Sequence, residues 1–408
     1  MSRLLILFED GHWSDLRPLT EVLPVPALAF GASSLGERWR RALGVPLLGF
    51  QARPYALAAW RDAPTSDGTR AVPGDDVVAI NAAALPGPWL GRALEGRSPA
   101  LWISADRIAG ARLRYEQVAP GLGGGDGFER FLRERGLPEE RVEASWLHWP
   151  WDFVERNPAA LAEDLAGLRS EALGEVHPTA AILEPERVRI ETGTRVDAYA
   201  VLDARGGPIH LREGAVVHSH TIVSGPCAVG PRTELLGGFI GNSTLGPDCR
   251  IAGEVDACIW QGYANKRHHG FVGHSVVGEW VNLGALTTTS DLKNNYGQVR
   301  VWAGGREIDS GISKVGSFLG AHVKTGIGSL LPTGASIGTG SNLVGGARFA
   351  PRHLPPFSWW DGEKTLEHRL EKFLETAQAA MSRRRQTLGP ADHAALRRVF
   401  DAARHERT

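Results

Sequence analysis

The 408-residue sequence is short of cysteine, of long apolar runs and of any excess of charge. Its three cysteines, Cys227, Cys249 and Cys258, are odd in number and lack metal-ligand spacing, so they predict reduced, buried thiols in a cytoplasmic protein. No run reaches the roughly 18 apolar residues of a membrane span, and RLLILF at 3–8 is too short for a signal peptide. A formal net charge of −1 argues against nucleic-acid or membrane-surface binding.

Lysine is the scarcest charged residue. Only six of the 45 basic residues are lysine, and none precedes Lys266. Where arginine dominates in this way, a lysine either marks a site that needs a compact ammonium or lies by chance on a solvated face. Both interpretations stay open for the four lysines Lys266, Lys293, Lys314 and Lys324.

The most informative stretch is 258–297, which places paired histidines, two lysines and four asparagines between short apolar segments. Apolar or small residues recur at intervals of six, a period that fits neither a helix nor an alternating strand but predicts a parallel β-helix. The polar stretch 287–296 interrupts the period, so we expect a projecting loop that carries function. The periodic positions are Phe271, Val277, Leu283, Leu319, Thr325, Leu331, Ile337 and Leu343.

The first part of the chain alternates strand and helix patterns, which predicts an α/β layer fold. Buried strands are expected at 3–8, 76–80 and 100–104, and helices at 34–43 and 128–135, the first with Glu37, Arg38, Arg40 and Arg41 facing outward. A helix is expected over 158–173, with Asn157 as its N-cap, Pro158 at its first position and Gly174 just past its end.

These patterns predict four parts. They are an α/β domain at 1–157, a linker helix at 158–175, a β-helix at 176–360 and C-terminal helices within 361–408. The last part contains amphipathic segments at 364–385 and 391–404, which we expect to cap the β-helix or to line a subunit contact.

The motifs GYANKRHHGFVGHS, GEWVNLGA, SDLKNNYG and PPFSWW carry a family resemblance. Through them the second half resembles the acetyltransferase domain of bifunctional sugar-1-phosphate nucleotidyltransferase/acetyltransferases, in particular a divergent bacterial GlmU-like branch. The resemblance implies a left-handed parallel β-helix of hexapeptide repeats. The first half is similar to the Rossmann-like nucleotidyltransferase domain of the same proteins, chiefly through DLRPLTEVLPVPAL.

For the second half the resemblance implies acyl transfer from acetyl-CoA to an amino-sugar phosphate within a homotrimer. It makes His268, three residues before Phe271, the general base that accepts the amine proton. Lys266 is then expected to hold the sugar phosphate and Asn282 the sugar. Phe271 replaces the family tyrosine, which leaves the acyl acceptor open. The residues expected at coenzyme A are Lys293, Asn294, Asn295, Tyr296, Ala321, Lys324 and Thr339.

For the first half the resemblance implies nucleotidyl transfer from a nucleoside triphosphate to a sugar phosphate with Mg²⁺, which needs positive charge at the phosphates. Relatives supply a glycine-rich loop ending in arginine and a Pro-Lys-Pro segment. Here Asp15 ends the loop DGHWSD, and Val25 stands in place of the lysine. The remaining candidates are Arg17, Arg38 and Asn81 for substrate and Asp152 for metal. Three of them have ordinary alternatives: a loop salt bridge for Arg17, a solvated helix face for Arg38 and a helix cap for Asp152.

The sequence therefore leaves three functions open. The first is a two-domain enzyme, the second an acyltransferase with a non-catalytic nucleotide-sugar-binding module, and the third a non-catalytic trimeric scaffold. A bare scaffold has no need of the GYANKRHH turn or the NNYG loop, so these motifs favour the first two functions.

Overall fold

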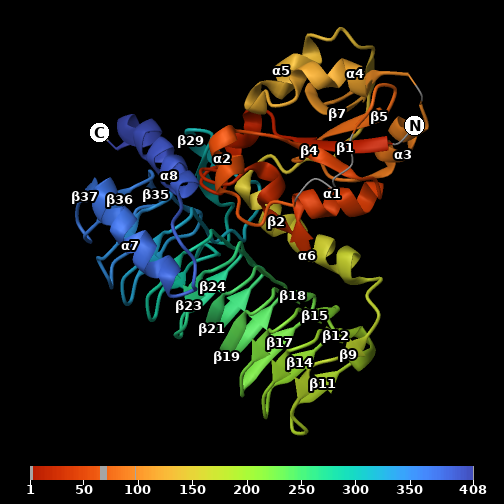
Figure 1. The fold of residues 1–408 in the computed structure, drawn as a ribbon. Helices are drawn as coiled ribbons and strands as arrows, with labels where there is room; N and C mark the ends of the chain where they lie inside the picture. The colour runs from red at the N-terminus through yellow and green to blue at the C-terminus, as the bar shows by residue number, and fades with distance from the viewer. Residues whose placement is uncertain (1–2, 65–70, 97, 408) are drawn as a thin grey trace. The chain divides into compact units, whose positions relative to one another are not determined.

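A computed structural model describes residues 3–64, 71–96 and 98–407 of the chain (Figure 1). It contains two compact units. The amino-terminal unit comprises Met1–Asp15, Val22–Leu28 and Ser33–His148, and the carboxyl-terminal unit comprises Leu16–Glu21, Ala29–Ala32 and Trp149–Thr408.

The amino-terminal unit is built on a six-stranded sheet in the order β4-β1-β5-β7-β6-β8. β1 pairs in parallel with β4 and β5, whereas β7 is antiparallel to both β5 and β6. The residues of β1 after Arg3 are buried on both faces, which explains why its sequence is a continuous apolar run. The strands are β1 (Arg3–Phe8), β4 (Leu47–Gln51), β5 (Asp76–Asn81), β6 (Ala100–Ser104), β7 (Arg107–Arg114) and β8 (Glu139–Arg141).

Helices surround this sheet, and the best defined of them is α1 (Leu35–Leu43). Ser34 caps it by accepting a hydrogen bond from the Glu37 N–H at 3.2 Å, and Gly44 ends it in the left-handed conformation at φ +62°. The predicted helix is confirmed, but Arg38 is buried instead of facing solvent. The other helices are α2 (Pro54–Ala59), α3 (Pro88–Glu95), α4 (Tyr115–Val118) and α5 (Phe128–Arg133).

The helix expected to begin at Pro158 begins eight residues earlier. α6 spans Pro150–Leu165, with Pro150 at the first helical position, where its missing N–H costs nothing. Asn157 lies inside the helix, where its side chain accepts from the Gly31 N–H at 2.8 Å and donates to Thr244 Oγ1 at 3.0 Å. An Asn-Pro pair imitates a helix start locally, but here the asparagine serves tertiary contacts.

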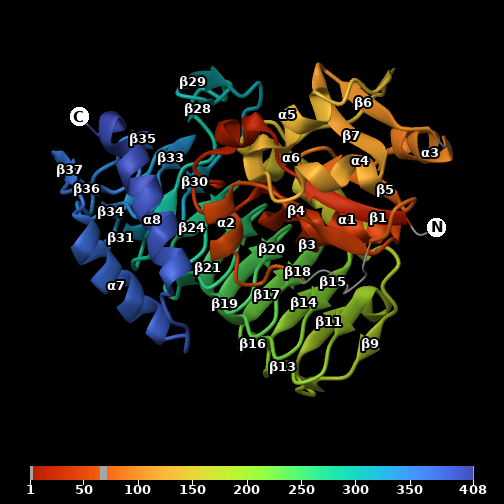
Figure 2. The same ribbon diagram turned by 45° about the horizontal axis from the view of Figure 1, so that its top comes forward.

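The carboxyl-terminal unit contains the predicted left-handed parallel β-helix (Figures 1 and 2). Each strand pairs in parallel with a strand of the next coil, as Phe318 does with Ser336 and Leu319 with Ile337. One sheet contains β9 (Glu171–Ala172), β12 (Val188–Ile190), β15 (Ile209–Leu211), β18 (Cys227–Val229), β20 (Thr244–Leu245), β22 (Ile259–Trp260), β25 (Val276–Val277), β30 (Ser317–Leu319), β33 (Ala335–Ile337) and β35 (His353–Leu354).

A second series of strands forms another side of the coils. It contains β10 (Glu175–Val176), β13 (Arg195–Val196), β16 (Val216–Val217), β19 (Glu234–Gly241), β21 (Arg250–Asp256), β23 (Asn265–Lys266), β26 (Asn282–Leu283), β31 (Lys324–Thr325), β34 (Asn342–Leu343) and β36 (Ser358–Trp360). The long strands β19 and β21 also pair with a third series. Its members are β11 (Ala181–Leu183), β14 (Val201–Asp203), β17 (Thr221–Ser224) and β24 (Phe271–Gly273), while β27 (Thr288–Thr289) and β32 (Leu330–Leu331) pair with each other.

The six-residue period is confirmed by burial at Val277, Leu283 and the later positions up to Leu343. Phe271 is the exception, because it is half-buried and its neighbour Val272 occupies the core. The three cysteines are free and buried, as expected. Within the described ranges, every helix is too short or too polar to cross a bilayer.

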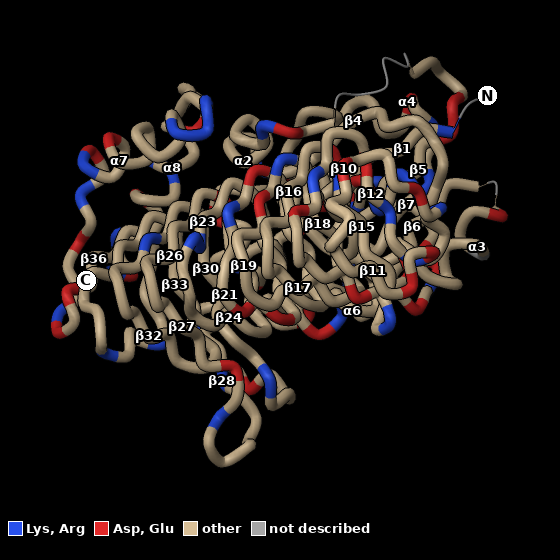
Figure 3. Tube along the Cα trace, turned by 90° about the horizontal axis from the view of Figure 1, so that it is seen from below, with Lys and Arg blue, Asp and Glu red and all other residues tan. Residues whose placement is uncertain are grey.

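The projecting loop starts later than expected. Thr288 still pairs with Leu330 in the coil, and the excursion begins at Asp291, whose carbonyl accepts from the Val315 N–H at 2.9 Å. It carries the antiparallel hairpin of β28 (Arg300–Ala303) and β29 (Arg306–Asp309), which projects from the coils in Figure 3.

Two helices follow the last coil, α7 (Leu370–Ser382) and α8 (Pro390–Ala402). The first was expected from residue 364, but Thr365–Glu367 instead forms β37, antiparallel to β36. Leu366 is consequently 57% exposed, although it was expected on the apolar face of a helix. Phe357 joins both helices to the coils, with ring centroids 4.9 Å from Phe373 and 5.2 Å from Phe400.

Candidate functional site: a cationic pocket on the β-helix

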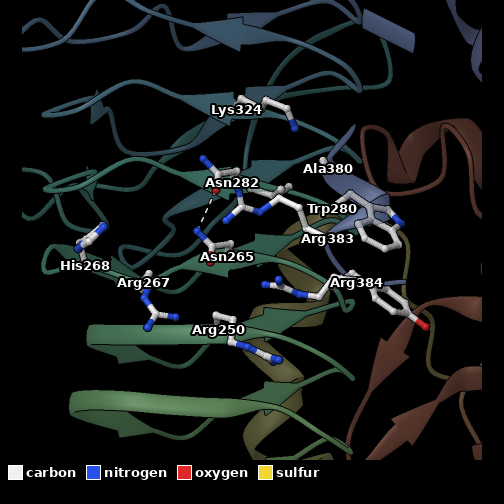
Figure 4. A pocket seen from close by; sticks show the side chains of 12 residues that line it. Arg250, Asn265, Arg267, His268, Trp280, Asn282, Lys324, Ala380, Arg383 and Arg384 are labelled. Atoms are coloured by element: carbon white, nitrogen blue, oxygen red, sulfur yellow. Dashed lines mark hydrogen bonds between the residues drawn. The ribbon is translucent and has the colours of Figure 1, made fainter. Parts of the chain in front are cut away.

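A pocket of about 490 Å³ lies between the outer side of the β-helix and the C-terminal end of α7 (Figure 4). All of its lining belongs to the carboxyl-terminal unit. The lining residues are Arg250, Tyr263, Asn265, Arg267, His268, Trp280, Val281, Asn282, Lys324, Ala380, Arg383 and Arg384.

Strand register builds the floor of the pocket. Arg250 pairs with Asn265, Asn265 with Asn282, and Asn282 with Lys324 on four consecutive coils. Parallel strands in register stack equivalent side chains roughly 4.8 Å apart, so these four form one outward-facing column. Within it, Asn265 Nδ2 donates to Asn282 Oδ1 at 2.8 Å.

The pocket is strongly cationic. Five of its described lining residues are arginine or lysine, and none of the twelve is acidic. Arg250 is oriented from behind by Glu234 Oε1 at 3.0 Å, and Arg384 Nε donates to the Asp248 carbonyl at 3.3 Å. Burial lowers the pKa of Arg384, which indicates a guanidinium partly withdrawn from water. Such an arrangement attracts an anion.

Lys324 is the most informative of these cations. Its ammonium nitrogen is fully covered and, among the described residues, has no hydrogen-bond partner. Burial lowers its pKa to about 8. An ammonium without partners is costly to bury, and an anionic ligand in the pocket would supply the missing partner. Figure 4 shows the Lys324 side chain entering the site above Asn282.

Lys266 has a different environment from the one predicted. It is 1% exposed, and its Nζ donates to the carbonyls of Ala252 at 2.9 Å and His268 at 2.8 Å. Its ammonium is therefore satisfied inside the coil, and the predicted contact with a sugar phosphate does not fit. What Lys266 does is hold the backbone of the His268 turn.

His268 is exposed and lines the pocket together with Arg267 and Asn282. The structure thus brings together three predicted residues: His268, Asn282 and Lys324. The adjacent His269 is also exposed but does not line the pocket.

An aromatic wall completes the site. The rings of Tyr263 and Trp280 stack with centroids 4.4 Å apart and planes 10° apart. Both residues have positive φ, 55° and 61°, at corners of successive coils. Sequence reasoning missed this pair and also Arg383 and Arg384, which directly follow α7 and for which the run SRRR at 382–385 was the available signal.

Apart from Lys324, which lines the pocket, the residues predicted for coenzyme A divide into two groups. Lys293, Asn294, Asn295 and Tyr296 begin the excursion, and Tyr296 is 75% exposed. Lys293 Nζ donates to the Gln298 carbonyl, and Asn295 Oδ1 accepts from the Gly297 N–H at 3.1 Å. None of the four lines the pocket, so within one chain they stay apart from His268.

The contact of Ala321 and Thr339 with the pantetheine arm stays a prediction, but three of their backbone groups have partners within the chain. The Thr339 N–H donates to Glu21 Oε2 at 2.6 Å, and its carbonyl accepts from the Phe357 N–H at 2.8 Å. The Ala321 carbonyl accepts from the Gly340 N–H at 2.9 Å. These backbone groups are already used by the fold.

In the amino-terminal unit, Asn81 belongs to a buried network at the ends of β1 and β5. Its Nδ2 donates to Asp10 Oδ2 at 2.9 Å, and Arg107 donates to both carboxylate oxygens of Asp10 at 2.8 and 3.0 Å. Glu9 pairs in the same way with Arg53 at 2.7 Å and accepts from the Val25 N–H at 3.0 Å. Because both acidic residues are bound to buried arginines, they do not fit the oxygen shell that Mg²⁺ requires.

Arg17 and Asp152 have the ordinary roles considered as alternatives. Arg17 belongs to the carboxyl-terminal unit and pairs with Glu406 at 2.6 Å and Glu21 at 3.7 Å. Asp152 Oδ2 accepts from the Trp149 N–H at 2.8 Å and so caps α6. Predicted substrate and metal contacts at these two residues therefore have no support from their placement.

Comparison with known proteins agrees with the motifs. The family model for sugar nucleotidyl transferases matches residues 5–172. A bifunctional sugar-1-phosphate nucleotidylyltransferase/acetyltransferase of Sulfurisphaera tokodaii is 40% identical over 80 residues, 20% of each chain. A bifunctional protein GlmU of Methanocaldococcus jannaschii is 28% identical over 229 residues, 52% of this chain and 47% of the relative. The matches thus span half or less of these relatives' own length.

Among solved structures, an Arabidopsis UDP-N-acetylglucosamine acyltransferase aligns with 57% of this chain and 96% of its own, at 12% identity and a TM-score of 0.23. Another UDP-N-acetylglucosamine acyltransferase aligns with 57% and 89%, at 14% identity and a TM-score of 0.19. Residues 5–172 thus match the sugar nucleotidyl transferase family, and the chain is similar to bifunctional GlmU proteins.

Proposed function

We propose that the β-helix domain transfers an acyl group from a coenzyme A thioester, such as acetyl-CoA, to the amine of a phosphorylated amino sugar. One observation carries the proposal: the His268 imidazole shares a pocket with five cationic side chains and no acidic one among the described lining residues. A site of this kind selects a polyanionic acceptor and offers its amine a proton acceptor.

In the proposed reaction His268 takes a proton from the ammonium or attacking amine. The amine nitrogen forms a bond with the thioester carbonyl carbon, the carbon–sulfur bond breaks, and coenzyme A leaves as thiolate to be protonated. Lys324, Arg383 and Arg384 would hold the acceptor phosphate, and the Tyr263–Trp280 wall would pack against a sugar or base ring. Asn282, fixed by Asn265, would hydrogen-bond the sugar.

The donor is proposed to reach the site along the excursion. Asn294, Asn295 and Tyr296 are exposed there, and Lys293 begins the same turn. Because these residues stay apart from His268 in one chain, the excursion of a second subunit in a homotrimer would have to supply them. The homotrimer remains a prediction, as does a cytoplasmic location, which the three reduced thiols favour.

For the amino-terminal unit we propose binding of a nucleotide sugar without nucleotidyl transfer. The proposal is supported by Val25 in place of a lysine and by Asp10, whose carboxylate accepts from both Asn81 and Arg107. Nucleotidyl transfer needs positive charge free to follow the phosphates, and these groups are bound to each other.

A thiol-release assay tests the acyltransferase directly. The full chain is given acetyl-CoA and a panel of amino-sugar phosphates, and free coenzyme A is measured with wild type and His268→Ala. Phosphate-dependent turnover in wild type that is lost in the variant supports the proposal. Absence of turnover with every phosphorylated amine, or equal rates in the two proteins, would overturn it.

A further inference from the structure

Three metal-ligating side chains meet in the amino-terminal unit, next to the buried Asp10 but without using its carboxylate. His12 Nδ1 lies 2.8 Å from Asp15 Oδ2, and His148 Nε2 lies 3.9 Å from the same oxygen. The three ligand atoms all lie within 4.8 Å of one another. The two imidazole rings face each other at a centroid distance of 5.4 Å and 49° between planes.

Local geometry explains the convergence. His12 and Asp15 lie on a 3₁₀ helix, η1 (Gly11–Leu16), in which residues three apart eclipse and so share one side. The start of this helix is fixed because Asp10 Oδ1 accepts from the His12 N–H at 3.1 Å. His148 approaches from just before α6 and completes the set.

We propose that His12, Asp15 and His148 bind one divalent transition-metal cation of the Zn²⁺ class and leave coordination positions open for an anionic oxygen ligand. Imidazole nitrogen bonds Zn²⁺ at about 2.0–2.1 Å and carboxylate oxygen at about 2.0–2.2 Å, so ligand atoms sit about 3.3 Å apart around the ion. The three ligand atoms lie within 4.8 Å of one another, so rotations of these side chains would have to close the remaining distance. Two histidines and one carboxylate are also a donor set that Mg²⁺ does not favour.

One contact must change on binding. Arg107 Nη1 lies 3.4 Å from His148 Nδ1, which fits a metal-free ring that accepts at Nδ1 and donates at Nε2. When Nε2 binds a metal, Nδ1 carries the proton and this long contact is given up. Arg107 keeps its ion pair with Asp10 at 2.8 Å and its place over the Trp146 ring at 4.0 Å.

A bound metal would also provide a positive charge for phosphate binding that the neighbouring arginines do not offer. Arg53 and Arg107 are each bound to a buried carboxylate, and the chain has no lysine before Lys266. A bound cation with open positions would give this end of the sheet a group that attracts phosphate oxygens. The proposed attraction of phosphate oxygens rests on the proposed nucleotide-sugar binding, whereas the metal site itself does not.

The test uses chelator-treated full-length protein titrated with Co²⁺, whose visible absorption reports imidazole and carboxylate ligation. We expect one Co²⁺ per chain, displacement by Zn²⁺ but not by Mg²⁺, and affinity loss of more than about 100-fold in His12→Ala and His148→Ala, since losing even a ligand's supporting partner costs about 10–100-fold. His393→Ala, at an exposed histidine of α8, is the matched control and should bind as wild type does.

A second measurement needs no variant. Zn²⁺ should protect His12 and His148 of the wild-type chain from chemical acylation, read by mass spectrometry, while His393 stays reactive. Failure of Co²⁺ to absorb, unchanged affinity in both variants, or equal acylation with and without Zn²⁺ would each overturn the metal site. A metal spectrum that does not respond to inorganic phosphate would overturn the open coordination positions alone.

Discussion

The imidazole Nδ1 of His274 lies 2.8 Å from Oδ2 of Asp291, the first residue of the excursion between β27 and β30. A carboxylate that orients an imidazole is a familiar arrangement for a general base. His274 does not line the cationic pocket, however, whereas His268 does. We therefore assign the His274–Asp291 pair to anchoring the root of the excursion and His268 to catalysis.

Replacing each histidine separates these roles. His268→Ala should lower thioester-dependent turnover by about 10²–10⁴-fold, the usual contribution of a general base. His274→Ala should lower kcat by less than about tenfold and instead raise KM for acetyl-CoA, because it loosens the excursion that carries Asn294 and Tyr296. The reverse pattern in the thiol-release assay would make His274 the base.

Lys324→Met should weaken anion binding to the pocket and stabilise the folded chain. Removing an ammonium without partners should raise the free energy of unfolding by about 1–3 kcal/mol, measured by urea denaturation. Lys364→Met, at an exposed lysine, is the matched control and should change stability by less than about 0.5 kcal/mol. Loss of stability in Lys324→Met would mean that the ammonium has a stabilising partner.

Anion binding to the pocket should weaken as pH rises through about 8, because burial lowers the pKa of Lys324 to about 8. Stability changes in the opposite direction. Between a pH of about 8 and the ordinary lysine pKa of 10.5, the unfolded chain holds a proton that the folded chain has released. The free energy of unfolding therefore rises with pH in this range. Calorimetric titration with a sugar phosphate from pH 6.5 to 9.5 measures the first effect. Lys324→Arg should abolish the decline, since a guanidinium keeps its charge.

Leu319→Ala should lower stability by about 2–5 kcal/mol, because the side chain is completely buried in the β-helix core and its loss leaves a cavity. Leu366→Ala is the matched control at a leucine that is 57% exposed in β37. Thermal unfolding of the two variants compares them directly. Equal destabilisation would contradict the stacked core.

Arg17→Gln should leave nucleotide affinity unchanged and lower stability by no more than about 1 kcal/mol, as expected for a partly exposed ion pair. The measurement is the shift in melting temperature produced by a nucleotide sugar in wild type and variant. A shift abolished by the substitution would restore Arg17 as a phosphate contact despite its pairing with Glu406.

Periodicity predicted the β-helix because every coil repeats the same demand for a small or apolar residue, as at Leu331 and Ile337. It failed at Phe271, where the adjacent Val272 occupies the core. Two predicted helix starts were wrong for a related reason. Asn157–Pro158 and the segment from residue 364 look locally like helix starts, but tertiary hydrogen bonds and the β36–β37 pairing decide the outcome.

Apart from Lys324, the candidate site was predictable only where its residues share one short stretch. His268 and Asn282 lie in the motif-rich segment, and the structure brings them to one pocket. Arg250, Arg383 and Arg384 reach that pocket by coil register and by the packing of α7, neither of which is written in local sequence. The burial of Lys266 was equally hidden, because an exposed and a buried lysine look alike in a sequence.

The excursion at 291–315 leaves the ladder unbroken, since Val276 pairs directly with Phe318 and Val277 with Leu319 across it. Coil stacking thus places no demand on the length or composition of the inserted segment. A change in the length of this segment should therefore leave the stacked coils intact. Under the proposed function, the contacts to the acyl donor could then vary while the coils that present the acceptor stay the same.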